Sequence, residues 1–433
     1  MKVEEPAEPS TSETEGSKTG MSLQEAFDKY GFKLSSFETR EIFRFILWER
    51  RATKINGGID LRDTSRFDDE YGFYRFVPED HLAYRYELVK PLGKGTTAQV
   101  FSAVDHKENR SVAIKVMKSQ PRYHRQAKSE IEMLERLNNL NKDGNIDVVQ
   151  MYDHFCFRNH ACIVFELLSE NLWSVIKETK KQGLPLHRVQ GFACSLIKVL
   201  DALGRNKIMH GDLKLDNILV KQTGKSDIKL IDFGMAEYDQ EDETALIQAL
   251  HYRAPEVILG AKYGRQVDMW SFGVILTELF TGKTVPEGSD ESDQLALGME
   301  VFGVPPPEFL ELCSRAKNFI KDGEPCFADV RSSANMRAPP GCRELSSVLK
   351  NCEDVHFLGF IRGCLTWDPR ARLTPSQALV HPFITNKIPR PDDNEKSAFS
   401  PAAEDSQPDS AVSRGTYKER RVTNKRKRSE LED

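Results

Sequence analysis

The feature that most constrains the fold is a change in hydrophobic pattern near residue 170. Before it, short branched and aromatic runs at 100–104, 111–116 and 161–167 predict strands, with one helix at 123–140. After it, apolar residues recur at helical spacing, as in 187–204 and 268–281. A strand-rich lobe followed by a helix-rich lobe is an α+β plan, with a cleft expected between the lobes.

The segments that flank this two-lobed region differ in composition. Residues 1–21 are mostly Glu, Pro, Ser and Thr, and residues 385–433 are again polar. Neither segment can bury enough apolar surface to fold alone, so we expect both to be disordered. In residues 22–51 apolar residues recur at helical spacing and predict helices, and the globular pattern begins near residue 86.

Composition argues against several classes of protein. The 61 Lys and Arg against 66 Asp and Glu give a net charge of −5, which disfavours a general nucleic-acid or membrane-surface binder. The N-terminus lacks the pattern of a signal peptide, and the most apolar run, 270–280, is too short and polar to span a bilayer. The 8 cysteines form no CxxC pair and no Cys/His cluster with zinc-ligand spacing, so no structural zinc is predicted.

We therefore expect a soluble intracellular protein with neither nucleic-acid nor membrane partners. The basic segment 418–428 (KERRVTNKRKR) is either a nuclear import signal, read by an import receptor, or a solvated basic tail. The expected localisation is cytoplasmic, nuclear or both.

The first candidate site is a glycine-rich loop between two predicted strands, with the pattern GxGxxA. Its residues are Leu92, Gly93, Lys94, Gly95, Thr96, Thr97, Ala98, Gln99 and Val100. Small residues let backbone N–H groups approach phosphates closely. Alone, a glycine hairpin explains the pattern as well, and the absence of a following GK[ST] excludes a Walker loop.

The second candidate is a lysine paired with a glutamate. Lys115 ends the run Val112-Ala113-Ile114-Lys115, and Glu130 shares a helix face with Ala127, Leu134 and Leu137. A carboxylate on this inward stripe needs a cation, which Lys115 can supply. A solvated edge lysine and a solvated helix glutamate are the alternative interpretation.

Three polar motifs follow in the second half of the chain. Asp212 and Asn217 stand five residues apart on the loop HGDLKLDN, Asp232-Phe233-Gly234 follows a predicted strand, and Ala254-Pro255-Glu256 comes later. Each motif alone could be a polar loop. In this order, the Gly-loop, VAIK, HxDxxxxN, DFG and APE motifs match the signature set of protein kinases.

This resemblance implies the bilobal protein kinase fold, α+β, with a small β-rich N-lobe and a larger helical C-lobe. It implies ATP and Mg²⁺ as cofactors and protein substrates. Lys115, held by Glu130, would bind the α- and β-phosphates, and Asn217 and Asp232 would ligate Mg²⁺. Asp212 would accept or orient the substrate hydroxyl proton, and Lys214 would steady the γ-phosphate.

Other positions take binding or structural roles under the same resemblance. The backbone of Phe165, Glu166, Leu167 and Leu168, where the lobes join, would bind adenine. Glu256 would pair with Arg372, Asp268 would anchor the backbone of the catalytic loop, and His210 would be a core hydrogen-bonding residue rather than a base.

Further segments are similar to one kinase family, the dual-specificity tyrosine-phosphorylation-regulated kinases. They include FDDEYG at 67–72, DHLAYRYE at 80–87, YHRQA at 123–127 and FRNH at 157–160. The stretch 23–54 resembles the accessory region of the class II members. The resemblance implies residues 22–85 as an accessory region with a homology box, and 86–384 as the kinase domain. It also implies phosphorylation of Ser or Thr before Pro, often with an upstream Arg.

The chain departs from the family pattern at several positions. Gly211 stands where members carry Cys, and Leu215 and Asp216 stand where Pro and Glu are usual. The family's activation-loop Tyr-x-Tyr is replaced by 244–246, which puts tyrosine autophosphorylation in doubt. Where members pair a phosphotyrosine with arginine, this chain has Leu246 and Leu250. These two leucines are predicted to pack together, with Arg253 turning to the acidic run 239–243.

Three functions remain open from the sequence. The leading hypothesis is an active protein Ser/Thr kinase. The irregular glycine loop, Gly211 and the altered activation loop suggest a pseudokinase scaffold as the alternative, although Lys115, Glu130, Asp212, Asn217 and Asp232 are all present. A small-molecule kinase is disfavoured by the APE segment and the long helical lobe.

Overall fold

The computed structural model describes residues 67–238, 245–321, 323–326 and 338–388, together with positions 24, 28 and 32. The chain divides into two units, 1–388 and 389–433. Residues 1–21, most of the predicted helices at 22–51, and residues 389–433 with the basic segment 418–428 therefore lie outside the described residues. The tail expected from residue 385 begins later, because Thr385 ends a helix, Pro382–Thr385, and 386–388 are also described. Within 22–51, Gln24 and Asp28 are helical, and the Gln24 amide donates to the Asp28 carboxylate at 3.0 Å.

The N-lobe is built on an antiparallel sheet in which β-branched and aromatic residues alternate with polar ones. The sheet has six strands in the order β1-β2-β3-β4-β6-β5. Their bounds are β1 (His81–Leu82), β2 (Tyr86–Lys94), β3 (Ala98–Asp105), β4 (Arg110–Met117), β5 (Met151–Phe157) and β6 (His160–Glu166). The predicted strands are confirmed with ends shifted by one or two residues, and Leu167 lies beyond β6, partly exposed.

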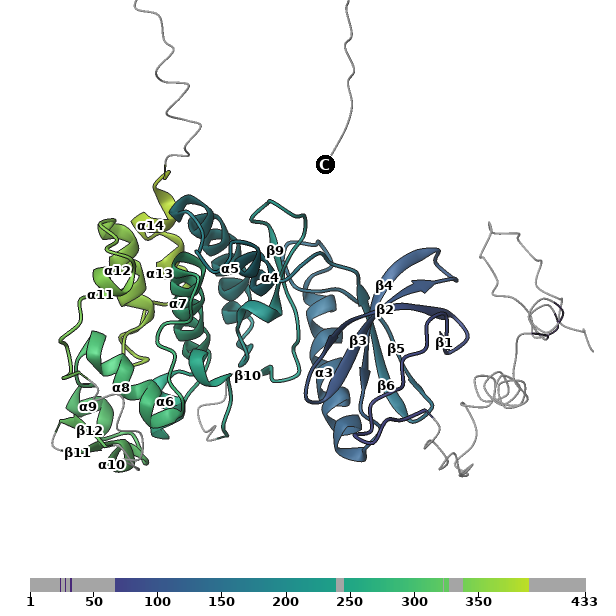
Figure 1. Cartoon of the computed structure of the whole chain (residues 1–433), viewed down its shortest axis with the longest axis horizontal. Helices are drawn as coiled ribbons and strands as arrows, with labels where there is room; N and C mark the ends of the chain where they lie inside the picture. The colour runs from purple at the N-terminus through teal and green to yellow at the C-terminus, as the bar shows by residue number, and fades with distance from the viewer. Residues whose placement is uncertain are drawn as a thin grey trace, which may run out of the picture. The chain divides into compact units, whose positions relative to one another are not determined.

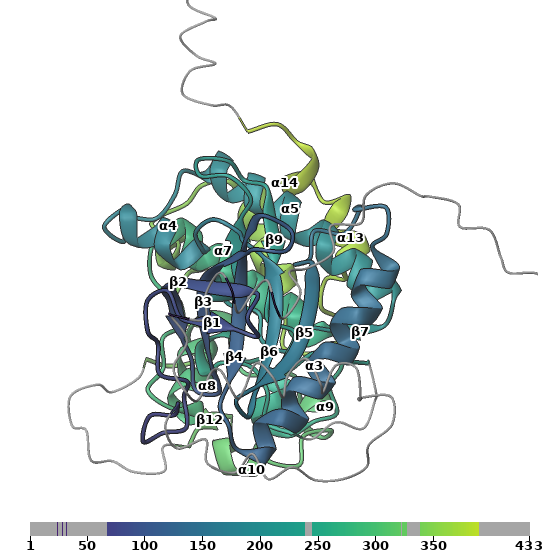
Figure 2. The same ribbon diagram turned by 90° about the vertical axis from the view of Figure 1, so that its right-hand side faces the viewer.

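Helix α3 (Pro121–Leu140) crosses the sheet and begins two residues earlier than predicted, because Pro121 suits the first turn of a helix. Its buried stripe includes Glu130, Leu134 and Leu137. Figure 2, which views the molecule from the N-lobe side, shows α3 beside β5 and β6. The helix thereby brings the Glu130 carboxylate against Lys115 of β4.

The segment 67–85 is part of the N-lobe core. Tyr74 and Leu82 are buried with Tyr86, Phe101 and other residues of the sheet. Because Arg85 also forms ion pairs with Asp105 at 2.7 Å and Asp153 at 2.8 Å, the segment is fastened by both apolar and ionic contacts.

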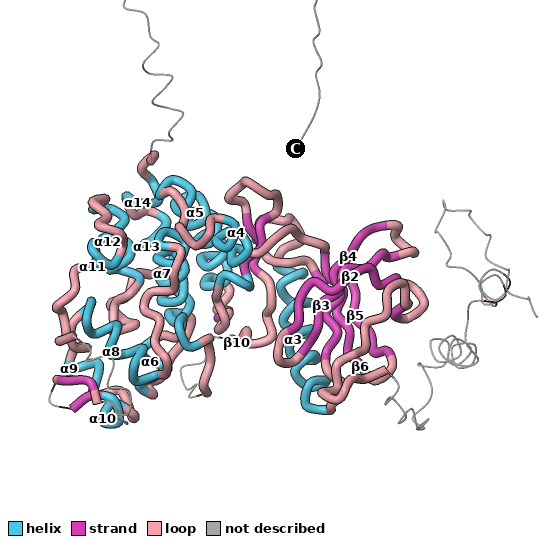
Figure 3. Tube along the Cα trace, viewed as in Figure 1, coloured by secondary structure: helices cyan, strands magenta, loops and turns pink. Residues whose placement is uncertain are grey.

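The C-lobe is helical, as the pattern after residue 170 predicts (Figures 1 and 3). Its helices are α4 (Leu172–Glu178), α5 (Leu186–Arg205), α6 (Pro255–Leu259), α7 (Gln266–Thr281), α8 (Glu291–Phe302), α9 (Pro307–Leu310), α10 (Ala316–Phe319), α11 (Leu345–Val348), α12 (Val355–Cys364), α13 (Pro375–Leu379) and α14 (Pro382–Thr385), with 3₁₀ turns η2 (Leu215–Asn217) and η3 (Leu250–Tyr252). Short strand pairs complete it: β7 (Ile208–Met209) with β10 (Glu237–Tyr238), β8 (Ile218–Val220) with β9 (Ile228–Leu230), and β11 (Ile320–Lys321) with β12 (Glu324–Pro325).

Helix α7 lies at the centre of this lobe and is buried on nearly every side. It packs against α5 and α12, which explains why its sequence is apolar without a helical stripe. The hairpin β8–β9 contacts the segment that precedes β5, because the Leu230 N–H donates to the Asp147 carbonyl and the Val149 N–H donates to the Leu230 carbonyl, both at 2.9 Å. Among the described residues, no helix has the length and apolar character needed to cross a membrane.

Candidate active site

The predicted lysine–glutamate pair forms at the floor of the N-lobe, and a third group joins it from the C-lobe. Lys115 Nζ on β4 lies 2.7 Å and 2.9 Å from the Glu130 carboxylate oxygens. The same nitrogen lies 2.7 Å from Asp232 Oδ1. Since Lys115 and Asp232 are 117 residues apart, this contact joins the two lobes at one charged centre.

Burial and charge compete at this centre. Burial alone lowers the pKa of Lys115, but the two carboxylates outweigh it and hold that pKa above its ordinary value. For Asp232, burial acts upward, yet the charge and hydrogen bond of Lys115 bring the pKa below its usual range. Burial raises the pKa of Glu130 against the opposing charge of Lys115. Lysine is therefore charged and Asp232 ionised at neutral pH.

The catalytic-loop residues also converge. Lys214 Nζ lies 2.6 Å from Asp212 Oδ2, and Asn217 Nδ2 donates to the Asp212 backbone oxygen at 2.8 Å and to its Oδ2 at 3.1 Å. Turn η2 places Asn217 just before β8. The Asn217 amide therefore lies beside the Asp212 carboxylate, five residues earlier in the chain. The Asp212 carboxylate is thereby held in a fixed orientation.

The backbone of this loop is anchored as predicted. Asp268 accepts the backbone N–H of His210 at 2.7 Å and that of Gly211 at 3.0 Å. The His210 ring bonds the Ile231 carbonyl at 3.0 Å and packs edge-on against Phe233, so its expected structural role is confirmed. Gly211 has φ +74°, a left-handed conformation that favours glycine, so its place in this loop is structurally explained.

The glycine-rich loop between β2 and β3 leaves open space. A Cβ added to Gly93 would meet no protein atom within 4 Å, and one added to Gly95 only the Ala98 carbonyl at 3.8 Å. Packing within the described structure therefore does not require either glycine. The two glycines leave room for a group that approaches the backbone.

Three predicted members of this loop direct their side chains elsewhere. Ala98 is buried with Met117 and Tyr123, away from the loop opening. The Gln99 side chain donates to the Tyr74 carbonyl at 3.1 Å. Lys94 Nζ lies 3.9 Å from the centre of the Phe73 ring. These residues can offer only backbone groups to a nucleotide, a distinction that the motif does not reveal.

The segment joining the lobes is similarly restricted. The Glu166 carboxylate accepts the Gln150 backbone N–H at 2.8 Å and lies 2.5 Å from Lys229 Nζ in the C-lobe. Its side chain is thus committed to holding the lobes together. At Glu166, the backbone groups therefore remain as candidate partners for adenine.

The activation segment differs from the prediction. Leu246 is 60% exposed and the neighbouring Ile247 is buried, so the proposed packing of Leu246 on Leu250 is wrong. Arg253 binds Glu291 at 2.8 Å and the carbonyls of Ile247 and Gln248 at 2.9 Å each. The acidic run 239–243 lies outside the described residues. Two of the hydrogen-bond acceptors of Arg253 are backbone carbonyls. Such acceptors cannot be predicted from a pattern of side chains in the sequence.

Comparison with known proteins agrees with this geometry. The family model described as the protein kinase domain matches residues 86–384. The chain is 44% identical over 390 residues to dual specificity tyrosine-phosphorylation-regulated kinase mbk-2 of Caenorhabditis elegans, 86% of this chain and 48% of the relative. It is also 44% identical over 386 residues to dual specificity tyrosine-phosphorylation-regulated kinase 3 of Macaca fascicularis. That match covers 85% of this chain and 68% of the relative.

The chain belongs to the dual-specificity tyrosine-phosphorylation-regulated kinases. The human member numbered 4 is 40% identical over 394 residues, 89% of this chain and 75% of the relative. The chain spans about half the length of the nematode members (48%).

Within this family frame, the residues present fit Mg-ATP. Asp232 and Asn217 offer carboxylate and amide oxygens, which are the hard ligands that Mg²⁺ prefers. Lys115 would offer a cation to phosphate oxygens, and the glycine loop would offer open backbone. When bound, the metal would neutralise charge on the phosphates.

Sequence reasoning missed one residue of this site. Gln248 has φ +64°, and its buried side chain bonds the Val267 carbonyl, Ser271 and the Ala254 N–H. Its backbone N–H donates to the Gly211 carbonyl at 3.1 Å, so the activation segment is tied to the catalytic loop. Its proximity to the catalytic-loop motif depends on the fold and carries no local sequence signal.

Proposed function

We propose that this chain transfers the γ-phosphate of ATP to serine or threonine of protein substrates, with Mg²⁺. Lys115 binds the α- and β-phosphates, and Asn217 and Asp232 hold the metal. Asp212 orients the substrate hydroxyl and accepts its proton, while Lys214 steadies the transferred group. The observation that carries the proposal is the pair of contacts that Lys115 makes with Glu130 and Asp232. These contacts join the two lobes at the expected phosphate-binding site.

The test is phosphate transfer from ATP to peptides by the purified chain. Lys115→Met and Asp232→Asn are expected to abolish transfer, and Asp212→Asn to lower the rate by about 10²–10⁴-fold, the usual value of positioned proton transfer. Lys128→Met is the matched control, because Lys128 is exposed on the same helix as Glu130. A wild-type chain without activity would favour the pseudokinase scaffold, and full activity in Lys115→Met would refute the assigned site.

We further propose that substrates carry proline after the phosphorylated residue. The Gln248 carbonyl is held by Arg253 in a left-handed segment tied to the catalytic loop. A carbonyl engaged in this way accepts poorly from the N–H of a bound peptide, which would then lose a hydrogen bond. Proline has no N–H and therefore loses nothing.

A pair of peptides differing only by Pro or Ala after the target serine tests this preference. We expect kcat/KM to favour the Pro peptide by on the order of tenfold, the equivalent of one hydrogen bond. Arg253→Gln should reduce the ratio toward unity, whereas Arg315→Gln, which removes the other arginine on Glu291, should preserve it. Equal use of both peptides by the wild-type chain would refute the proposal.

A further inference from the structure

Three potential metal ligands, at positions 81, 87 and 106, lie on the outer face of the N-lobe sheet. His81 on β1 is directly opposite Glu87 on β2, and Glu87 is paired with Val104 on β3. His106 lies two residues beyond Val104, so it follows the same face of the strand. Diagonal neighbours of this kind are within reach of long side chains. The strand register therefore brings the three side chains together.

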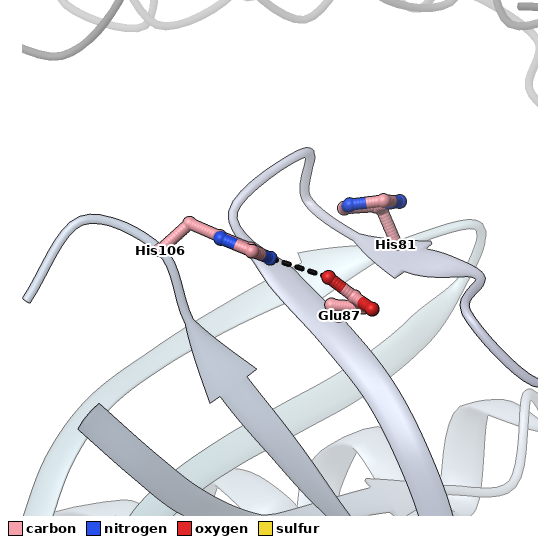
Figure 4. A group of neighbouring side chains, drawn as sticks. All are labelled: His81, Glu87 and His106. Atoms are coloured by element: carbon pink, nitrogen blue, oxygen red, sulfur yellow. Dashed lines mark hydrogen bonds and ion pairs between the residues drawn. The ribbon is translucent and has the colours of Figure 1, made fainter. Parts of the chain in front are cut away.

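Figure 4 shows the three side chains grouped together, with the His106 ring directed at Glu87 and the His81 ring close to both. One ligand atom from each residue lies within 4.8 Å of the others. His106 Nε2 is 2.6 Å from Glu87 Oε2, and the side chains of His106 and Glu87 are 53% and 32% exposed. The inward neighbours of Glu87, Tyr86 and Leu88, are buried, so alternation fixes Glu87 on the solvent side.

The backbone beneath these side chains is fixed on several sides. The His106 N–H donates to the Arg85 carbonyl at 3.1 Å, and Leu88 N–H donates to the Asp80 carbonyl at 2.8 Å. Arg85 in turn binds the buried Asp105, which immediately precedes His106. His81 and Glu87 therefore lie on paired strands, and His106 is the first residue of the turn after β3, held there by its backbone bond to Arg85, which lowers the ordering cost of binding.

We propose that His81, Glu87 and His106 form a binding site for a divalent transition metal, Zn²⁺ by preference. Two imidazoles and one carboxylate are a donor set that Zn²⁺ accepts, with water completing a tetrahedron. Ligand atoms around tetrahedral zinc lie about 3.3 Å apart, given bonds of about 2.0–2.1 Å. Binding thus requires the 2.6 Å distance between His106 Nε2 and Glu87 Oε2 to lengthen slightly. It also requires the His81 ring to turn toward the metal.

The site lies away from the nucleotide region. Glu87 is six residues before Gly93 on β2, which corresponds to about 20 Å along a strand. A metal there would join β1, β2 and the end of β3, and so fasten the segment before the kinase domain to the sheet. The expected effect is on N-lobe stability rather than on the chemical step. No zinc-ligand spacing in the sequence predicts this site, because its ligands come from β1, β2 and the end of β3.

The test is Zn²⁺ titration of the full chain against a chromophoric chelator, combined with thermal unfolding. Because Cys156 and Cys342 are exposed thiols and thiolates are zinc ligands, both are changed to Ser in the starting protein. We expect one Zn²⁺ per chain at this site and a melting temperature raised by a few degrees. His81→Gln and His106→Gln should each weaken binding by on the order of tenfold or more.

His154→Gln is the matched control. His154 is an exposed histidine 3.4 Å from Glu135, and the described residues place no third ligand beside them. This variant should bind Zn²⁺ like the starting protein. Equal affinity in His81→Gln, His106→Gln and His154→Gln would overturn the proposal, as would the absence of stoichiometric binding. All variants should unfold at the same temperature without metal, which separates ligand loss from misfolding.

Discussion

At the residue scale, the buried contact between Glu256 and Arg372 shows how distant motifs stabilise the C-lobe. The two residues are 116 positions apart, and Arg372 binds both Glu256 oxygens, at 2.6 Å and 2.8 Å. Both side chains are fully buried. The predicted pair is confirmed. Because the pair is buried, removing one partner destabilises the fold by more than the net free energy that the pair contributes.

Glu256→Gln is expected to reduce the free energy of unfolding by about 3–5 kcal/mol, because it leaves the Arg372 charge buried and uncompensated. Urea unfolding of the purified variant measures this. Arg370→Gln is the control, since Arg370 is exposed and the loss of its ion pair with Asp368 should change the midpoint little. A midpoint for Glu256→Gln equal to that of the wild-type chain would contradict the assignment.

At the element scale, the glycine-rich loop is held by the segment that precedes the kinase domain. Lys94 lies 3.3 Å from Asp69 and over the Phe73 ring, and Gln99 bonds the Tyr74 backbone. Both ends of the loop are thereby restrained from outside the domain. The segment that precedes the kinase domain is therefore in direct contact with the glycine-rich loop.

Lys94→Met is expected to raise KM for ATP by up to about fivefold with little change in kcat, since an exposed pair is worth about 1 kcal/mol at most. Steady-state kinetics at varied ATP concentration measure the change. Lys90→Met, an exposed lysine on the same strand, serves as the control and should leave KM unchanged. A lower kcat with unaltered KM would indicate a different role for Lys94.

The activation segment is a second element whose packing can be tested. Ile247 is buried and Leu246 is exposed, so Ile247→Ala is expected to destabilise the chain by about 2–4 kcal/mol and Leu246→Ala to have little effect. Chemical unfolding and peptide phosphorylation of both variants provide the comparison. If Leu246→Ala lost stability as much as Ile247→Ala, the observed arrangement of this segment would be wrong.

The same segment bears on activation. Arg253 is bound by Glu291 and two backbone carbonyls without a phosphate, so we expect activity in chain expressed in bacteria with no activation-loop phosphotyrosine. Mass spectrometry combined with a kinase assay tests this. Activity that appears only with phosphate on Tyr238, Thr244 or Tyr252 would contradict it.

At the scale of the whole molecule, the N-lobe includes residues that precede the domain matched by the kinase family model. The segment 67–85 supplies β1 and core residues such as Tyr74 and Leu82. Asp68 binds the buried His160 at 2.8 Å, and Asp80 lies 3.4 Å from Arg158. The sheet and this segment therefore share one core.

We expect a fragment of residues 67–388 to remain folded and a fragment of residues 86–388 to be insoluble or to melt at a much lower temperature. The shorter fragment would expose the inner face of the sheet and leave Asp105 without Arg85. Expression yield and thermal unfolding of the two fragments distinguish these outcomes. Equal melting temperatures would show that the segment contributes no stability.

The sequence by itself determined the order of strands and helices and the identity of the charged residues at the centre. Alternation and helical periodicity are local, so the predicted strands β3, β4 and β6 and the helices α3, α5 and α7 agree with the structure within about two residues, whereas β1 and β5 were not predicted. The motifs containing Lys115, Glu130, Asp212 and Asp232 were also recognised, because phosphate and metal binding demand those residue types in that order.

Only the tertiary structure decided which groups meet and where side chains point. The exposure of Leu246, the use of Ala98 in a small core cluster and the left-handed Gln248 depend on packing between distant segments. The group formed by His81, Glu87 and His106 depends on strand register. Such contacts have no local signature, because their energy comes from neighbours that the chain brings together only when it folds.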